Sequence, residues 1–108
     1  LDSIDVLTTP EQKTVPFYIS YAATLETELG NFEKALEKAE QLEKIINNNK
    51  APAIYYTYAK IYLAMDSLDL AKSNIEKAIQ LDAKHQLAYR VQKVIDQKLL
   101  ERETDSMN

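Results

Sequence analysis

The chain has 108 residues, no cysteine, one glycine and one histidine, and its formal net charge is −4 at pH 7. This length suits one domain with a modest core and argues against two full domains. Without cysteine there is no disulfide framework or thiolate zinc site, one glycine is too few for a glycine-rich phosphate loop, and the acidic balance argues against nucleic acid as the main partner.

Residues 1–16 are predicted to form an arm or linker ahead of the helices. They mix polar and apolar side chains and carry Pro10 and Pro16, which disfavour a long helix. The first residue is Leu1 rather than methionine, so we expect a fragment or a processed form. The compartment stays open, with the cytoplasm favoured over a bacterial periplasm. No stretch approaches the ~20 apolar residues that span a bilayer, so membrane insertion is not expected.

Five amphipathic helices follow, because apolar residues recur every three or four positions after Pro16. Pro16 is expected in the first turn of the first helix, and Gly30 is expected to end that helix in a left-handed conformation. The expected helices run from Pro16 to the Gly30 turn, from Phe32 to a break at residues 47–50, from Pro52 to Asp66, from Ser67 to about Leu81, and from about Gln86 to Glu103. Residues 104–108 are expected to form a frayed tail.

The first four helices contain an internal repeat with an offset of 36 residues, as between Ala35 and Ala71. The other aligned pairs are Ala39 and Ile75, Leu42 and Ala78, and Ile45 and Leu81. Each unit is predicted to be an antiparallel helical hairpin. Its small residues let the helices approach closely, and stacked hairpins share a continuous core.

This pattern resembles the tetratricopeptide repeat, a hairpin of about 34 residues. The likeness is carried by small residues, a turn and two aromatics, namely Ala23, Ala59, Gly30, Asn31, Phe32, Ala35, Ala71, Ala78, Tyr55 and Tyr62. The sequence departs from the family pattern at Glu26, Leu42, Asp66 and Ala83. The resemblance implies an all-α short solenoid of two antiparallel hairpins, at residues 17–50 and 51–85, followed by a capping helix at 86–103.

The resemblance also implies a non-catalytic module for protein interaction, because in this family the first helices line a concave groove that receives peptide segments. The partner-binding residues expected in the groove are Ser20, Thr24, Thr27, Tyr56, Lys60, Leu63 and Arg90. One subset of the family clamps a terminal carboxylate with Lys and Asn. Here Ser20 and Thr24 take the matching first-repeat positions and lack the positive charge for that role. An ordinary solvated face is the alternative reading.

Tyr18, Tyr21 and Leu25 form a second candidate surface, because that side of the first helix would meet a preceding repeat. Either the arm covers this face, or a second copy of the chain or an upstream segment does. The apolar residues of the arm are Ile4, Val6 and Leu7. The alternative function is therefore an oligomerisation or sensor module of a larger regulator or envelope protein, with a possible homodimer.

Residues suited to chemistry are sparse. His85 lies in a predicted turn beside Lys84 and is expected to be solvent-exposed and inert. The glutamates of residues 33–43 alternate with lysines, which is typical of a solvated helix face. Because no nucleophile with a base and no cluster of metal ligands is visible, we expect no catalytic, cofactor or metal site and no enzyme activity.

Overall fold

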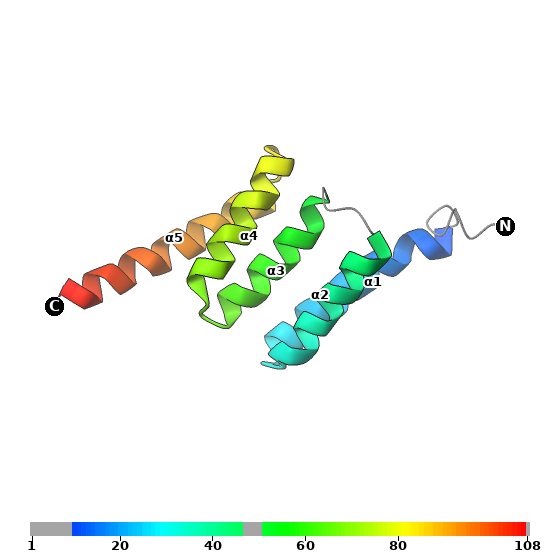
Figure 1. The fold of residues 1–108 in the computed structure, drawn as a ribbon, viewed down its shortest axis with the longest axis horizontal. Helices are drawn as coiled ribbons and strands as arrows, with labels where there is room; N and C mark the ends of the chain where they lie inside the picture. The colour runs from blue at the N-terminus through cyan, green and yellow to red at the C-terminus, as the bar shows by residue number, and fades with distance from the viewer. Residues whose placement is uncertain (1–9, 47–50, 108) are drawn as a thin grey trace.

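Five α-helices make up the part of the chain that a computed structural model describes, residues 10–46 and 51–107, with side chains described for 15–46 and 51–105. They are α1 (Pro10–Glu28), α2 (Phe32–Ile46), α3 (Pro52–Ala64), α4 (Leu68–Leu81) and α5 (Gln86–Met107) (Figure 1). No strand occurs within these ranges. The predicted all-α class and the start of each helix from α2 to α5 are confirmed.

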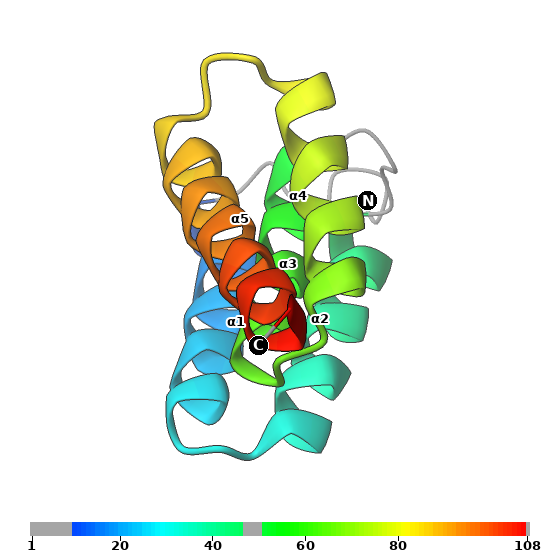
Figure 2. The ribbon, with the colours of Figure 1, turned by 90° about the vertical axis from the view of Figure 1, so that its left-hand side faces the viewer.

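The helices stack as successive hairpins and do not close into a bundle. The first hairpin is α1–α2 and the second is α3–α4; α3 packs on both helices of the first hairpin, and α5 packs on both helices of the second. Within the described ranges α5 makes no contact with the first hairpin. The first helices α1, α3 and α5 therefore form one layer, and α2 and α4 form the other (Figure 2).

The overall shape agrees with this stacking. The principal extents are 63 × 30 × 17 Å and the Cα radius of gyration is 15.4 Å. A compact globular domain of this length would have a radius of gyration of about 13 Å. The chain is thus a short solenoid, elongated along the direction in which the hairpins follow one another.

Both hairpin turns are Schellman motifs, and they are related by the 36-residue offset. In the first turn the Asn31 N–H donates to the Glu26 carbonyl at 2.8 Å, and the Gly30 N–H donates to the Thr27 carbonyl at 3.1 Å. The second turn repeats these bonds, from Ser67 to Tyr62 at 2.9 Å and from Asp66 to Leu63 at 3.0 Å. The repeat inferred from side chains therefore extends to individual backbone hydrogen bonds.

The two turns differ in the residue that takes the left-handed conformation. Gly30 has φ of 81°, and Asp66 has φ of 62° at the equivalent position. Aspartate tolerates this conformation better than most side chains with a Cβ. The Arg102 guanidinium also donates to the Asp66 carboxylate at 3.2 Å and to its carbonyl at 3.4 Å. The departure from glycine at Asp66 therefore leaves the turn geometry intact.

Small residues hold the hairpins together. Ala23, Ala35, Ala59 and Ala71 are 0% exposed. One buried cluster contains Ala23, Ala35, Ala39 and Ile61, and so joins the first hairpin to α3. A second cluster contains Ala59, Ala71, Ile75, Ala78, Ala88 and Ile95, and joins the second hairpin to α5. Each cluster spans a junction between units, so the core is continuous along the stack.

The prediction of an arm over residues 1–16 is wrong for residues 10–16, because α1 already begins at Pro10 and contains Pro16. Proline is well suited to a first helical position, where its missing N–H forfeits no bond. Good helix formers, Glu11 and Gln12, come directly after Pro10. Pro16 removes one backbone hydrogen bond, to the carbonyl of residue 12, and the helix continues through it. Residues 1–9 lie outside the described ranges.

The predicted end of the last helix at residue 103 is wrong, because α5 continues to Met107; Asn108 lies outside the described ranges, and fraying of residues 104–108 stays a prediction. The Arg102 contacts with Asp66 anchor the last part of α5 to the turn of the second hairpin. Two residues further along, the Thr104 hydroxyl donates to the Leu100 carbonyl at 3.0 Å. The contact of Arg102 with Asp66 joins residues 36 positions apart, so it depends on the fold and is not visible in the local sequence.

The packing of helices at the buried alanines can be tested by substitution. Replacing Ala59 by leucine should lower the free energy of unfolding by about 1–3 kcal/mol, because the added atoms overfill a closed junction between helices. The matched control is Ala64→Leu, on the same helix at an exposed position, which should change it by less than about 0.5 kcal/mol. Urea denaturation followed by circular dichroism measures both. Equal effects of the two substitutions would contradict this packing.

Candidate functional site

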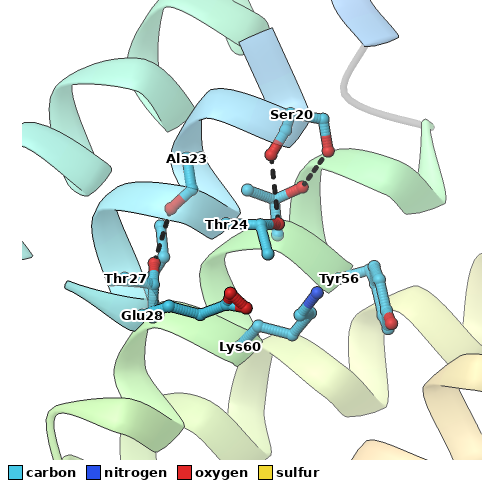
Figure 3. A pocket seen from close by; sticks show the side chains of 9 residues that line it. Ser20, Ala23, Thr24, Thr27, Glu28, Tyr56 and Lys60 are labelled. Carbon is cyan, nitrogen blue, oxygen red and sulfur yellow. Dashed lines mark hydrogen bonds between the residues drawn. The ribbon is translucent and has the colours of Figure 1, made fainter. Parts of the chain in front are cut away.

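A cavity of about 170 Å³ lies between α1 and α3, in the layer of first helices (Figure 3). Five of the seven predicted partner-binding residues line it, namely Ser20, Thr24 and Thr27 from α1 and Tyr56 and Lys60 from α3. The other lining residues are Ala23, Glu28, Thr57 and Ile61. The cavity is smaller than the roughly 300–1,000 Å³ of small-molecule sites. It is therefore too small to enclose a ligand of the usual size for such sites.

The hydroxyl groups of the wall donate their hydrogens within the protein. Thr24 donates to the Ser20 carbonyl at 3.2 Å, and Thr27 donates to the Ala23 carbonyl at 2.7 Å. The hydroxyl of Thr57, the one buried polar residue among those described, donates to the Ala53 carbonyl at 2.7 Å. These bonds repeat the i to i−4 pattern of hydroxyl residues in helices.

Ser20 links the two helices. Its hydroxyl oxygen lies 3.5 Å from that of Thr57 (Figure 3). Because Thr57 gives its hydrogen to Ala53, Ser20 is the donor in this pair. Each hydroxyl oxygen keeps acceptor capacity, so the wall formed by α1 offers acceptors to a ligand.

The charged groups of the cavity are Glu28 and Lys60, whose side chains both point into the space between the helices (Figure 3). The Lys60 ammonium lies 5.3 Å from the centre of the Tyr56 ring, in a cation–π contact. Burial raises the pKa of the Tyr56 phenol. The phenol therefore stays neutral at physiological pH, and Lys60 is the one cationic side chain among the described residues that line the cavity.

His85 differs from its sequence-based description as solvent-exposed. It is half-buried, and its ring lies 4.9 Å from the Tyr56 ring, centre to centre. Its Nδ1 accepts the Ala88 N–H at 3.1 Å, and so helps to satisfy the free N–H groups at the start of α5. The ring contact with His85 thus restrains the Tyr56 side chain. The contact between the His85 and Tyr56 rings could not be inferred from the turn sequence around His85.

The two remaining predicted groove residues lie elsewhere. Leu63 packs against the buried cluster between the second hairpin and α5. Arg90 is exposed on α5 and is not among the residues that line the cavity. Thr57 and Ile61 were not among the predicted groove residues. Both are next to a predicted groove residue in the chain, Tyr56 and Lys60 respectively, and so lie on an adjoining face of the same helix.

The second candidate surface, Tyr18, Tyr21 and Leu25, lies away from the cavity on α1, and we call it the stacking face. These side chains are 65%, 57% and 42% exposed. Residues 10–16 cannot fold over this face, because they continue the helix that carries it. The predicted cover by Ile4, Val6 and Leu7 lies outside the described residues.

Neither a metal cluster nor a membrane span was found in the described ranges. No group of three or more His, Asp or Glu residues is close enough together there to hold a metal ion. Likewise, none of the described helices combines the length and the apolar character that crossing a membrane requires.

Comparison with known proteins assigns the second hairpin. Residues 52–85, which contain α3 and α4, match the family model of the tetratricopeptide repeat. No curated protein and no solved structure matched the chain. The resemblance drawn from the alanines and turns is thereby confirmed, and the chain carries a repeat of the kind that generally builds non-catalytic scaffolds for protein interaction.

Tyr58, on α3, provides a test of the contact between α3 and α2. Its hydroxyl donates to the Glu43 carboxylate, and burial first, then this hydrogen bond, raises the pKa of the phenol well above its ordinary value of 10.0. In the unfolded chain Tyr58 ionises near that ordinary value, whereas in the fold it stays protonated. The stabilisation is therefore present below about pH 10 and is lost as the pH rises further.

The free energy of unfolding should thus fall between about pH 9 and about pH 11, and Tyr58→Phe should make this fall smaller. Tyr89→Phe is the control, since Tyr89 is 43% exposed on α5, and it should leave the fall unchanged. Urea denaturation across this pH range measures the difference. An identical pH dependence in Tyr58→Phe and the unmodified chain would contradict the Tyr58–Glu43 contact.

Proposed function

We propose that this tetratricopeptide-repeat chain is a non-catalytic module that binds a peptide segment of a protein partner in the cavity between α1 and α3. The observation that carries the proposal is the convergence of Ser20, Thr24, Tyr56 and Lys60, from two successive repeats, on one cavity. Such a site exists only when the hairpins are stacked. The repeat type of residues 52–85 supports a protein partner.

The chemistry of the wall favours a partner segment rich in hydrogen-bond donors. The hydroxyl hydrogens of Ser20, Thr24 and Thr27 are already used inside the protein, and Glu28 adds a carboxylate. Backbone N–H groups and neutral amide side chains would find acceptors there. A peptide carboxylate would find one cation, Lys60, which disfavours the carboxylate-clamp role.

Tyr56 is the expected anchor of binding. Its ring is half-buried, and contacts with the Lys60 ammonium and with the His85 ring restrain its orientation. Tyrosines held in place in this way lose little conformational entropy on binding and are frequent energetic centres of protein interfaces. Tyr56 therefore contributes more to affinity than the hydroxyl residues of α1.

The proposal is tested with short peptides selected from a random display library on the unmodified chain. Tyr56→Ala and Lys60→Glu should each weaken binding of the selected peptides about tenfold or more, because the first removes the aromatic anchor and the second removes the ammonium that restrains its ring. The matched controls are Tyr89→Ala and Lys34→Glu, which alter exposed residues on α5 and α2. Fluorescence polarisation measures affinity, and circular dichroism confirms folding.

Two results would reject the proposal. One is unchanged affinity in both cavity variants. The other is a loss of affinity of the same size in the controls, which would place binding on another face.

A further inference from the structure

The stacking face combines exposed apolar side chains with a complete absence of charge. Residues 15–25 contain no Asp, Glu, Lys or Arg, and Tyr18, Tyr21 and Leu25 recur there at helical spacing. The helix α1 lies at the N-terminal end of the stack (Figure 1). Single exposed apolar residues are normal on proteins, but a contiguous uncharged strip of large ones marks a contact surface.

The equivalent face of α3 shows what kind of contact this is. With the 36-residue offset, the stacking face corresponds to Ile54, Thr57 and Ile61. These residues are 3%, 5% and 1% exposed, and α3 packs on α1 and α2. Ile61 belongs to the cluster with three alanines of the first hairpin. This face of α3 is therefore buried by the hairpin that precedes it.

The helix α5 repeats the arrangement. With a further offset of 34 residues the same positions are Ala88, Val91 and Ile95. Ala88 and Ile95 are fully buried and Val91 is half-buried, all within the cluster that joins α5 to the second hairpin. Two of the three first helices thus bury this face against a preceding pair of helices, and α1 is the exception.

We propose that the stacking face docks a two-helix hairpin of the same repeat type that lies ahead of α1 in the same polypeptide. The fit requires small residues at the crossing, as Ala23, Ala35 and Ala39 supply to α3. Because Tyr18 and Tyr21 are larger than Ile54 and Thr57, the docking hairpin must also leave room for two rings. It must offer acceptors near their hydroxyl groups, which need partners when buried.

A second copy of the chain does not supply this partner in the same geometry. The hairpin surfaces that receive a first helix are occupied in the described structure, by α3 on the first hairpin and by α5 on the second. The segments that join successive helix pairs are short, residues 47–51 between α2 and α3 and residues 82–85 between α4 and α5. Residues 1–9 are more numerous than either, so there are enough residues ahead of α1 to connect it to a preceding hairpin. The proposal concerns a different face from the cavity and does not depend on peptide binding.

The test compares the 108-residue chain with the polypeptide extended upstream, as its gene encodes it, by at least one hairpin length. Tetranitromethane nitrates exposed tyrosines, and mass spectrometry locates the products. Tyr18 and Tyr21 should be nitrated in the 108-residue chain and protected in the extended one. Tyr89, exposed on α5, is the internal control and should react in both. This readout needs no substitution and so cannot fail through misfolding.

A substitution gives an independent readout. Tyr21→Glu should lower the melting temperature of the extended polypeptide by about 4 °C or more, because it places a carboxylate in a buried junction. It should leave the melting temperature of the 108-residue chain unchanged, as should Tyr89→Glu in both lengths.

Three outcomes would overturn the proposal. They are equal nitration of Tyr21 in both lengths, a gene that encodes no helical hairpin directly upstream, and a dimer of the 108-residue chain in sedimentation equilibrium that Tyr21→Glu dissociates. The last result would assign the face to a second copy.

Discussion

The structure depends on the close approach of helices at fully buried alanines. A methyl group at Ala23, Ala35, Ala59 or Ala71 lets two helix backbones come near enough for the larger residues beside it, such as Ile61 and Ile95, to fill the junction. Because the same small residues recur after 36 residues, each junction reproduces the one before. Each hairpin is therefore displaced along the stack by a similar step relative to the one before it, and the result is an open stack of hairpins.

The candidate site is a consequence of that stack. When α3 lies against α1, Ser20 and Thr57 meet through their hydroxyl groups, and Tyr56 and Lys60 face Thr24 and Glu28 across a small cavity. A single hairpin supplies the lining residues of one helix only. The candidate site and the fold are therefore coupled, since any change that separates α1 from α3 removes the site as well as part of the core.

The sequence predicted what depends on local periodicity and missed what depends on contacts between distant residues. The helices from α2 onward, the Gly30 turn and the buried Ala35 and Ala71 follow from spacing and turn chemistry. The start of α1 was predicted wrongly at Pro16, because a proline weakens a helix without always ending it. The reach of α5 past residue 103 rests on Arg102 and Asp66, which are 36 residues apart.

The site divides in the same way. Five of the seven groove residues lie together because helical spacing fixes the face that each occupies. The burial of Thr57 and the contact of His85 with Tyr56 could not be read from the sequence, since both depend on how one unit is placed against another.

Methyl nuclear Overhauser effects in solution test the stacking most directly. In the stacked structure, cross-peaks are expected from the Ile61 methyl groups to Ala23 and Ala35, and from Ile95 to Ala59 and Ala71, with none from Ile95 to the first hairpin. Cross-peaks between Ile95 and Ala23 or Leu42 would show a closed bundle and would contradict the stacked arrangement.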